Sequence, residues 1–539
     1  MSSFGDAARL LRHHFGYDAF RPAQARVVHA VLAGRDVLAV LPTGGGKSIC
    51  FQVPALAKGG IAIVVCPLIS LMQDQVAAAC ARGIPAAALH SGLDAAEQSA
   101  LLTRAGSGAL RLLYLSPERL ARSAGQLRAI LGVPTLFVVD EAHCIVEWGE
   151  DFRPSYRRLR EARWRLGQPQ ALALTATATP DTREAIVKAL ALGRRYGRGP
   201  EGCEQQLGSF DRPNLWLGVI RVRDERERLT RLNALLDTDD GTALVYAPTR
   251  GSTERVAASL RDAGFRAAAY HAGLPRERRA AVLRGFLADE LKVVVATCAF
   301  GMGIDKPDVR LVVHWTVPAT PESYFQEAGR AGRDGRLSRC VVLWRPDDTA
   351  IHRRQLDVTF PAPVLVERAW REPTAARRLP SSVAASVERL RGELDPDRGP
   401  VNWRPVLRRR QRAAARLQVM ERYLSGAGCR RAALLGYFGE RAPHRCAGCD
   451  GCAPPRVAAR LPAAAAERLR RLQGAFAGRP GAWGGALLEP PTLVRLALHP
   501  PDGPEALAAV PGVGPVIAER YGRTILRALA PGRGAVQAP

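Results

Sequence analysis

Short apolar runs alternate with stretches of helical periodicity from about residue 25 to residue 345, and most runs end in a polar or Gly/Pro-containing turn. Runs of this kind between turns are typical of buried parallel strands. Their alternation with helices predicts βαβ units, in which helices cover both faces of a doubly wound parallel sheet. The expected strands are Val37–Leu41, Ile61–Cys66, Leu112–Leu115, Leu136–Val139, Leu172–Leu174, Thr242–Tyr246, Ala267–Tyr270, Lys292–Ala296 and Leu311–Val313.

A Gly/Arg-rich segment at residues 193–208 interrupts this alternation. We therefore expect two α/β domains, residues 1–200 and 209–348, joined by a short linker. The strand signal then fades, and residues 349–456 are predicted to be mainly helical, with a cysteine cluster near their end. An Ala/Leu-rich segment, residues 462–535, is predicted to form a small helical domain.

The first predicted strand leads into a glycine-rich run, Leu-Pro-Thr-Gly-Gly-Gly-Lys-Ser at 41–48, and a helical stretch follows. Glycines in this setting let backbone N–H groups surround phosphate oxygens at the positive end of a helix dipole. Lys47 then supplies a charge for the β- and γ-phosphates, and the Ser48 hydroxyl can bind Mg²⁺. The strict motif has glycine in place of Leu41, so a plain glycine-rich turn is the alternative. The expected ATP-binding residues of this run are Thr43, Gly44, Gly45, Gly46, Lys47 and Ser48.

Two acidic residues, Asp140 and Glu141, directly follow the predicted strand Leu136–Val139. Ligands of doubly wound sheets bind at the carboxyl ends of the strands. Asp140 is therefore expected to hold Mg²⁺, and Glu141 to polarise the attacking water. Capping of the next helix is the alternative for such a pair.

The chain is strongly basic, with a formal net charge of +26 over 539 residues, and all but five of its 77 basic residues are arginines. An excess of this size favours a polyanionic partner such as nucleic acid. A basic enzyme with solvated faces is the alternative. No run of eighteen apolar residues and no apolar N-terminal stretch is present, so we expect no membrane segment, no secretory signal and a cytoplasmic location.

Four of the eleven cysteines lie close together in the sequence. They are Cys429, Cys446, Cys449 and Cys452. Two overlapping C-x-x-C steps with a third partner upstream are typical of a closed, structural Zn²⁺ site, because four thiolates leave no coordination position for water. An iron–sulfur cluster and free thiols are the alternatives.

Several motifs in one order resemble superfamily 2 helicases of the RecQ family. Asp-Glu-Ala-His at 140–143 is a signature of that superfamily. The other matching segments are Phe15–Gln24, Cys66–Gln75, Tyr114–Glu118, Leu174–Thr179, Phe210–Asn214, Tyr270–Gly273, Ala296–Asp305 and Tyr324–Gly335. The resemblance extends from about residue 10 to 345 and again over the cysteine cluster.

This resemblance implies two RecA-like lobes, a helical zinc-binding domain and an ATP- and Mg²⁺-dependent 3′-to-5′ DNA helicase. Such an enzyme translocates on single-stranded DNA and unwinds duplexes in DNA repair or recombination. The resemblance also places Arg21, Gln24, Gly303 and Asp305 at the ATP, with Gln24 reading the adenine edge.

Arg330 and Arg333 lie three residues apart on a predicted helix and would share one face of it. Facing the γ-phosphate of ATP held by the other lobe, they would act as catalytic arginine fingers. A solvated surface charge is the alternative for either of them.

Residues 147–156 resemble the aromatic-rich loop of RecQ helicases, which implies a role in coupling DNA binding to hydrolysis. The residues suited to base stacking and phosphate contact are Trp148, Phe152, Arg153 and Tyr156. Packing inside the lobe is the alternative for each aromatic. Glu150 stands where the family usually has histidine, so the coupling is expected to be tuned differently. The loops Thr175–Thr179 and Thr297–Gly303 are expected to contact the phosphate backbone.

The C-terminal part departs from the family. About ten residues separate Cys452 from the next helical segment, too few for the winged-helix domain that RecQ proteins often have. Residues 356–425 are longer than the resemblance leads us to expect, and are a candidate replacement DNA-binding unit. The segment around Val510–Gly522 resembles a short HRDC domain, with a helical bundle that has no DNA role as the alternative.

The expected partners are single-stranded and duplex DNA, with no membrane. We expect a monomeric motor associated with the nucleoid. The sequence does not show whether it has protein partners such as a single-strand-binding protein. Three alternatives remain: a DNA-stimulated ATPase with weak strand separation, an RNA helicase, and a non-catalytic DNA-binding protein on an inactive motor fold.

Overall fold

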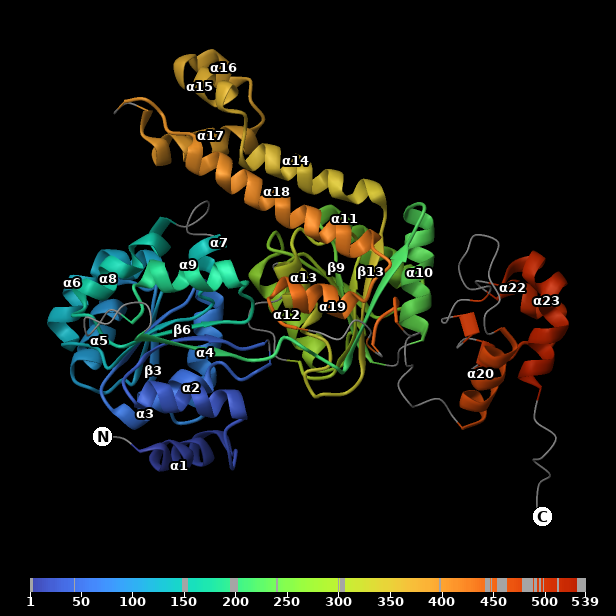
Figure 1. Ribbon diagram of the computed structural model, residues 1–539, viewed down its shortest axis with the longest axis horizontal. Coiled ribbons are helices and arrows are strands. Elements are labelled where there is room, and N and C mark those ends of the chain that lie inside the picture. The colour runs from blue at the N-terminus through green and yellow to red at the C-terminus, as the bar shows by residue number, and fades with distance from the viewer. Residues whose placement is uncertain are drawn as a thin grey trace.

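The computed structural model describes two α/β lobes, a helical arm, a cysteine-rich domain and a C-terminal helical domain (Figure 1). None of the helices it describes is long and apolar enough to cross a bilayer. The described residues are 3–42, 44–147, 154–193, 202–238, 241–298, 300, 306–396, 399–441, 446, 448–452, 463–476, 488, 492–493, 496–497, 499–510 and 513–530.

Lobe 1 is built on a seven-stranded parallel sheet with the strand order β3-β4-β2-β5-β6-β1-β7. Its strands are β1 (Asp36–Val40), β2 (Ala62–Val65), β3 (Ala86–Leu89), β4 (Leu112–Leu115), β5 (Leu136–Val139), β6 (Ala171–Thr175) and β7 (Cys203–Leu207). Alternate residues of β1 pack into two separate cores, Leu38 and Val40 on one face and Val37 and Ala39 on the other. The sheet is therefore covered on both sides, as the apolar runs predict.

Helices of lobe 1 flank this sheet, and several begin with a side-chain cap. For example, the Asp94 carboxylate accepts from the N–H of Glu97 at the start of α5. The helices are α1 (Phe4–Phe15), α2 (Pro22–Leu32), α3 (Ile49–Lys58), α4 (Ile69–Ala81), α5 (Ala95–Gly106), α6 (Pro117–Leu131), α7 (Cys144–Glu147), η1 (Pro154–Arg158), α8 (Leu159–Arg165) and α9 (Pro180–Leu190).

The predicted linker at 193–208 is partly wrong. Its last residues form β7, which pairs in parallel with β1 and extends lobe 1 to Leu207. The strand was not predicted because Cys-Glu-Gln-Gln-Leu is polar, and an edge strand has one side free of a neighbouring strand.

Lobe 2 has a six-stranded parallel sheet with the order β10-β11-β9-β12-β13-β8. Its strands are β8 (Leu215–Arg221), β9 (Thr242–Tyr246), β10 (Ala267–Tyr270), β11 (Val293–Ala296), β12 (Val309–His314) and β13 (Ser338–Trp344). Its helices are α10 (Glu225–Asp237), α11 (Arg250–Asp262), α12 (Arg276–Leu287) and α13 (Pro321–Ala328). The two-lobed parallel-sheet architecture predicted from the sequence is confirmed.

Residues 349–425, which we call the arm, follow lobe 2. In Figure 1 the α15 and α16 end of the arm projects away from both lobes, and the C-terminal end of α18 lies against lobe 2. The arm is helical, as predicted, and the short turn η4 (Pro346–Asp348) leads into it. Its helices are α14 (Thr349–Thr359), α15 (Pro363–Arg371), α16 (Pro373–Arg377), α17 (Ser381–Leu394) and α18 (Arg404–Ser425).

The cysteine-rich domain follows α18 and contains α19 (Arg430–Tyr437) and the four clustered cysteines. The C-terminal domain contains α20 (Ala463–Phe476), α22 (Pro504–Ala509) and α23 (Gly514–Leu529), which share a core of their own that includes Leu472 and Ile525.

Candidate functional site

The glycine-rich loop joins β1 to α3 and is shaped by two glycines in the left-handed region. Gly44 and Gly46 have φ angles of 79° and 72°, which other residues rarely adopt. A Cβ on Gly46 would lie 2.3 Å from Gln24 Nε2, and one on Gly45 would lie 2.8 Å from the carbonyl oxygen of Pro42. The loop therefore presents backbone and not side chains, as a phosphate cradle requires.

Arg21 and Gln24 hold this loop from the start of α2. Arg21 Nη1 donates to the Gly44 carbonyl at 2.7 Å, and Gln24 Nε2 donates to the Gly45 carbonyl at 3.0 Å. Gln24 Oε1 accepts from the Arg21 backbone N–H at 2.9 Å, and its side chain is buried. Both residues thus lie against the glycine-rich loop.

Asp140, at the carboxyl end of β5, is a buried carboxylate with few donors. Gln75 Nε2 and the Glu141 backbone N–H donate to it at 2.8 and 3.0 Å. Burial raises the pKa of Asp140, and the neighbouring Glu141 raises it further, against the opposing charge of Lys47. A divalent cation would supply the positive charge that this carboxylate lacks.

Glu141 lies among basic side chains. Its Oε1 lies 3.3 Å from Lys47 Nζ, and its Oε2 lies 3.4 Å from His143 Nδ1. Burial acts to raise the pKa of Glu141, but Lys47, His143 and Arg330 together outweigh burial and lower it. Glu141 therefore stays ionised, ready to accept a proton or polarise water. Its φ of 49° is unusual for a residue with a side chain, and such backbone strain clusters at functional sites.

Arg330 and Arg333 approach the glycine-rich loop from lobe 2. Arg330 is buried and lies near enough to Glu141 to lower its pKa. Arg333 Cγ lies 3.7 Å from the position of a Cβ on Gly44. The Nε of Arg330 is buried without a hydrogen-bond acceptor among the described residues, which suits an incoming anion.

The two arginines are not on a helix, contrary to the prediction. α13 ends at Ala328, and both residues lie in the consecutive turns that follow. Gly332 has a φ of 55° and reverses the chain there. A Cβ on Gly332 would lie 2.5 Å from Asn214 Nδ2 and 2.7 Å from the Arg336 carbonyl oxygen. We call residues 329–333 the finger turn.

The finger turn is braced by two residues at the start of lobe 2. Arg212 donates to the carbonyls of Gly329, Ala331 and Gly332 at 3.2, 3.0 and 2.9 Å. Asn214 Nδ2 donates to the carbonyls of Gly332 and Arg336 at 2.8 and 2.9 Å. Both belong to the segment Phe210–Asn214, whose match to the family was visible in the sequence although no role was assigned to it.

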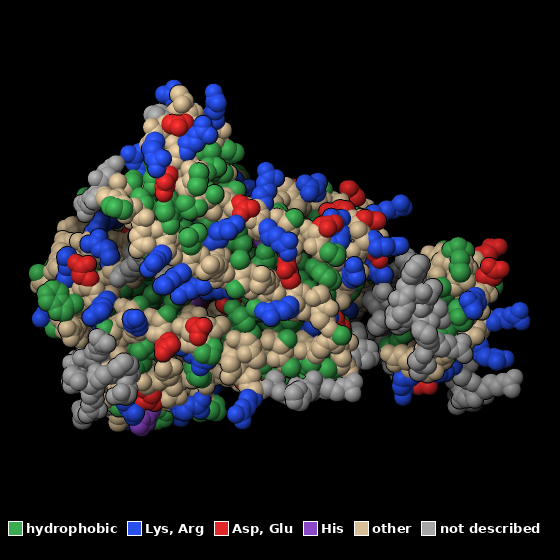
Figure 2. Space-filling model, turned by 45° about the horizontal axis from the view of Figure 1, so that its top comes forward, with side chains coloured by type: hydrophobic (Ala, Val, Ile, Leu, Met, Phe, Trp, Pro, Cys, Tyr) green, Lys and Arg blue, Asp and Glu red, His purple; other side chains and the backbone are tan. Residues whose placement is uncertain are grey.

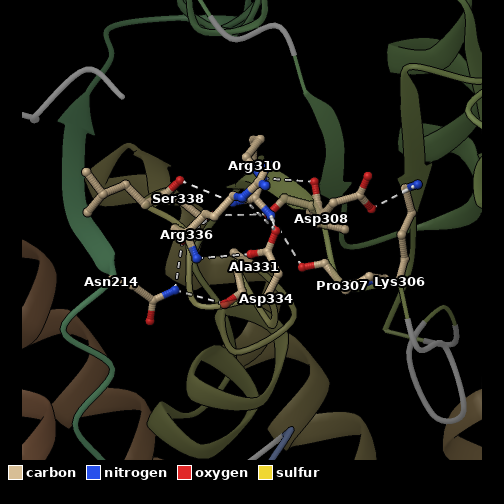
Figure 3. A network of polar contacts seen from close by, with 12 residues as sticks. Asn214, Lys306, Pro307, Asp308, Arg310, Ala331, Asp334, Arg336 and Ser338 are labelled. Atoms are coloured by element: carbon tan, nitrogen blue, oxygen red, sulfur yellow. Dashed lines mark hydrogen bonds and ion pairs between the residues drawn. The ribbon is translucent and has the colours of Figure 1, made fainter. Parts of the chain in front are cut away.

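Figure 3 shows further polar contacts around the finger turn, formed by Asp334 and by the residues next to the start of β12. Arg310 Nη2 pairs with Asp334 Oδ2 at 2.7 Å, and the Asp334 backbone N–H donates to the Pro307 carbonyl at 3.1 Å. Lys306 Nζ lies 2.8 Å from Asp289 and 3.0 Å from Asp308. The chain directly after the finger turn is therefore fixed to the residues that lead into β12.

The four clustered cysteines bring their sulfur atoms within 4.8 Å of one another. Four thiolates bound to one Zn²⁺ at about 2.3 Å fit such a cluster. Backbone N–H groups of Ala432 and Cys446 donate to the sulfurs of Cys429 and Cys452 at 3.4 and 3.3 Å. Cys429 also caps α19 through the hydrogen bond from the Ala432 backbone N–H. The site fits structural zinc, as predicted from the spacing.

This cysteine-rich domain contacts both lobes and the segment between them. Glu440 accepts from Ser209 Oγ at 2.5 Å and from the Phe210 backbone N–H at 2.6 Å. Arg183 of lobe 1 donates to the Phe438 carbonyl at 3.2 Å. In lobe 2, the Leu217 backbone N–H donates to the Gly448 carbonyl at 3.0 Å. The domain therefore ties lobe 1 to lobe 2.

The prediction that Tyr156 takes part in coupling to DNA is wrong. Its side chain is 1% exposed and belongs to the core of lobe 1, so no ring face is available to a base. Several other predicted site residues lie outside the described part of the chain. These are Thr43, Trp148, Glu150, Phe152, Arg153, Gly303 and Asp305.

The segment Thr175–Thr179 also differs from expectation, because its first four residues are buried. Thr175 Oγ1 lies 2.9 Å from His143 Nδ1 and donates to the Thr177 carbonyl at 3.1 Å. This strand end therefore connects to the His143–Glu141 pair and does not present its hydroxyl groups to solvent.

Family models match three parts of the chain. A DEAD/DEAH box helicase model matches residues 21–186, and a helicase conserved C-terminal domain model matches residues 226–335. The fold and the site between the lobes thus define a two-lobed helicase. A RecQ zinc-binding model matches residues 401–453.

Curated relatives name the family. The ATP-dependent DNA helicase RecQ of Synechocystis sp. is 37% identical over 481 residues, covering 82% of this chain and 97% of that protein. This chain belongs to the RecQ helicase family. RecQ of Pasteurella multocida is 37% identical over 451 residues, and the probable helicase RecS of Bacillus subtilis is 42% identical over 341. The matches cover 83% and 63% of this chain but only 62% and 66% of those two proteins.

Solved structures agree on the fold. Dbp5 of S. cerevisiae bound to RNA and ADP BeF3 matches with a TM-score of 0.52 and 17% identity, over 66% of this chain and 92% of that one. The DUF1998 helicase MrfA bound to DNA matches with a TM-score of 0.53 and 18% identity, over 65% of this chain and 52% of that one.

Proposed function

We propose that this protein is an ATP-dependent DNA helicase that translocates 3′ to 5′ on single-stranded DNA and unwinds duplexes. The observation that supports this most strongly is the site shared by the lobes, where Arg330 and Arg333 of lobe 2 lie beside the Lys47–Glu141 pair and the glycine-rich loop of lobe 1. Because ATP in this site would bind groups from both lobes, its hydrolysis would change how firmly the lobes are held together.

The residues have distinct proposed roles. Lys47 binds the β- and γ-phosphates in place of its present partner Glu141, which is then free to orient water. Ser48 and Asp140 would hold Mg²⁺, which neutralises phosphate charge. Gln24 would exchange its bond to Gly45 for the adenine edge.

Six further residues keep their predicted roles as proposals. Thr43, Gly303 and Asp305 complete the ATP site, and Trp148, Phe152 and Arg153 couple DNA binding to hydrolysis. This proposal also includes the 3′-to-5′ direction, a monomeric state, a location at the nucleoid and any protein partner.

Substitution of Lys47 tests the site. Lys47→Ala should abolish DNA-stimulated ATP hydrolysis while DNA affinity stays within about twofold, because the lysine lies at the phosphate loop and not on a DNA surface. Lys188→Ala, on the exposed side of α9, is the matched control and should hydrolyse ATP as the unaltered protein does. Unchanged turnover in Lys47→Ala would refute the assignment.

Substrate and direction need separate measurements. Unwinding of 3′-tailed, 5′-tailed and forked duplexes distinguishes the direction, and ATPase stimulation by DNA and by RNA distinguishes a DNA from an RNA helicase. A second function, a DNA-stimulated translocase with weak strand separation, is favoured by one observation. Only ten residues lie between Cys452 and the start of α20 at Ala463, which is too few for the winged-helix domain that RecQ proteins often have. Strong single-strand-stimulated ATPase with little fork unwinding would support that function.

A further inference from the structure

The arm lies mostly between the parts of the chain that family models match. The helicase C-terminal model ends at residue 335 and the RecQ zinc-binding model begins at 401. The helices α14 to α17 therefore lie outside these matches, whereas α18 lies within the zinc-binding match.

The arm is a folded unit with its own apolar core, formed by Phe360, Val366, Val387, Leu390 and Val406 among others. Trp370 and Trp403 stack with ring centroids 5.8 Å apart, and Trp403 Nε1 donates to Glu367 at 2.7 Å. These contacts hold the first half of α18 firmly against α15 and α17.

The arm is also more basic than the rest of the chain. It contains sixteen arginines, no lysine and eight acidic residues, a net charge of +8 in 77 residues, against +18 in the other 462. α18 alone contains seven arginines and one glutamate. The excess is therefore concentrated on one helix. Figure 2 shows basic side chains on the arm as well as on both lobes.

Three arginines of α18 pair with acidic side chains of neighbouring helices. Arg409 is buried and bonds to both oxygens of Glu393, at 2.5 and 2.9 Å. Arg410 pairs with Asp357 at 2.8 Å, and Arg416 Nε lies 3.6 Å from Glu322. These three position the helix.

Three others form an exposed row on α18. Arg404, Arg408 and Arg412 follow one another at intervals of four residues, so they share one face of the helix, and all three are exposed. The row extends over about 12 Å of helix axis. We call it the basic stripe.

We propose that the basic stripe binds the phosphate backbone of duplex DNA; this inference rests on the proposed helicase function. A row of guanidinium groups on a rigid helix complements phosphates without reading sequence. Duplex is favoured over single-stranded DNA because base stacking needs exposed aromatic faces. Among the described residues of the arm no aromatic side chain is exposed: Phe360 and Tyr423 are buried, and the two tryptophans stack on each other and are half-buried.

The same helix connects the stripe to the finger turn. At its far end Arg416 faces Glu322 of α13, and Tyr423 Oη donates to Tyr324 Oη of α13 at 3.2 Å. α13 runs directly into the finger turn. Duplex held by the arm is thus rigidly linked to the arginines that face the ATP site.

The arm also has an apolar groove, a cavity of about 390 Å³ lined by Phe360, Pro363, Leu365, Trp403 and Leu407 among others. A protein segment would bind there and not on the stripe. The experiment must therefore distinguish binding of DNA to the basic stripe from binding of a protein segment in the groove.

The test is the variant Arg404→Gln/Arg408→Gln/Arg412→Gln, in which glutamine keeps helix propensity. Arg104→Gln/Arg122→Gln/Arg226→Gln removes three exposed arginines from α5, α6 and α10 and is the matched control. Affinity for a 3′-tailed duplex and for the single strand alone is measured over a salt series. Circular dichroism checks that both variants fold.

For the tailed duplex, the slope of log K against log salt should fall by about 2.7 in the stripe variant, from three lost phosphate contacts. The unaltered protein should then lose about 40-fold more affinity than the variant between 50 and 200 mM salt. Single-strand affinity and single-strand-stimulated ATPase should stay within about twofold, and the control should behave as the unaltered protein.

Three outcomes would overturn the inference: an unchanged slope and affinity on the tailed duplex, an equal loss on the single strand, or an equal loss in the control. An unchanged slope and affinity on the tailed duplex, together with normal DNA-stimulated ATPase, would indicate instead that the arm binds a protein segment in its apolar groove. An unaltered protein with no DNA-stimulated ATPase would instead refute the proposed function itself.

Discussion

At the scale of single residues, the two adjacent carboxylates at the end of β5 are held in opposite ways. Glu141 is compensated by Lys47, His143 and Arg330, whereas Asp140 is buried with a raised pKa. A carboxyl group whose folded-state pKa is raised favours the fold at low pH, and this contribution is lost as pH rises through that pKa. Ionised Asp140 therefore destabilises the protein at neutral pH until a cation binds it.

The stability of Asp140→Asn tests this account. Without the buried charge, lobe 1 should be more stable at pH 7 by about 1 kcal/mol, or roughly 2–4 °C in its unfolding temperature. The gain should vanish below about pH 4, where the aspartate is protonated in both states. ATPase should be lost. Thermal unfolding with and without Mg²⁺ is the measurement, and Mg²⁺ with ATP should stabilise the unaltered protein more than the variant. A variant less stable than the parent at pH 7 would contradict the argument.

Arg330 gives a second prediction at this scale. Because its guanidinium lies beside Glu141, Arg330→Ala should reduce DNA-stimulated turnover about 10³-fold, while nucleotide binding by lobe 1 persists. Arg330→Lys should not restore activity, since an ammonium cannot reproduce the fork geometry of the guanidinium. Arg336→Ala, at a side chain 75% exposed, is the control. Steady-state ATPase and fluorescent-nucleotide binding decide the matter, and turnover within tenfold of the parent would remove Arg330 from the catalytic set.

At the scale of elements, α13 determines where the finger turn lies. Its buried Glu322 accepts from Tyr437 Oη of α19 at 2.6 Å and faces Arg416 of α18. A carboxylate this deeply buried needs such partners. Glu322 is thus a positioning residue, acting through α13 on Arg330 and Arg333.

Variants of Glu322 separate positioning from catalysis. Glu322→Ala should lower kcat about tenfold with KM for ATP changed little, since a small misplacement of the fingers affects the transition state most. Glu322→Gln should recover most of the activity, because its Oε1 still accepts the Tyr437 hydroxyl. Glu277→Ala, on an exposed position of α12, is the control. A rise in KM for ATP in Glu322→Ala, with kcat unchanged, would argue that Glu322 does not position the two arginines of the finger turn.

Most elements followed from the sequence, but four strands were not predicted: β3, β7, β8 and β13. Every predicted strand is present, because buried parallel strands are continuous apolar runs that stand out from their neighbours. β3 is Ala-Ala-Ala-Leu and β7 is mostly polar, so neither has the β-branched composition of a central strand. Both are edge strands, whose positions depend on tertiary packing. The other two missed strands, β8 and β13, contain apolar runs, so composition does not explain why they were not predicted.

The site was predictable to different degrees for the same kind of reason. Lys47, Asp140 and the four cysteines lie in short motifs whose spacing reflects a local geometry. Tyr156 was misplaced because an aromatic near an arginine looks alike in sequence whether it faces solvent or the core. Arg212 and Asn214 brace a turn more than a hundred residues away, and no local pattern contains that information.

At the scale of the whole molecule, the cysteine-rich domain holds the motor together. Glu440 binds the segment between the lobes, Arg183 of lobe 1 binds the Phe438 carbonyl, and the Phe438 ring stacks on Phe210 with centroids 4.6 Å apart. Arg431 donates at 2.8 Å to the carbonyl of Arg212, the residue whose side chain braces the finger turn. Zinc therefore stabilises the relation between the lobes, although its ligands lie outside the ATP site.

Loss of zinc should accordingly uncouple the lobes without unfolding them, since each sheet has apolar cores on both faces. Cys446→Ser should release zinc, leave most of the far-ultraviolet circular dichroism, and lower DNA-stimulated ATPase at least about tenfold through misplaced fingers. Nucleotide binding should persist, because Lys47 and the glycine-rich loop belong to lobe 1. Hydrogen exchange should rise in α19 and in residues 209–215 but not in β1 or β5. Cys80→Ser, at an exposed cysteine outside the cluster, is the control. A zinc-free variant with normal ATPase and unchanged exchange at residues 209–215 would show that the domain does not hold the lobes in register.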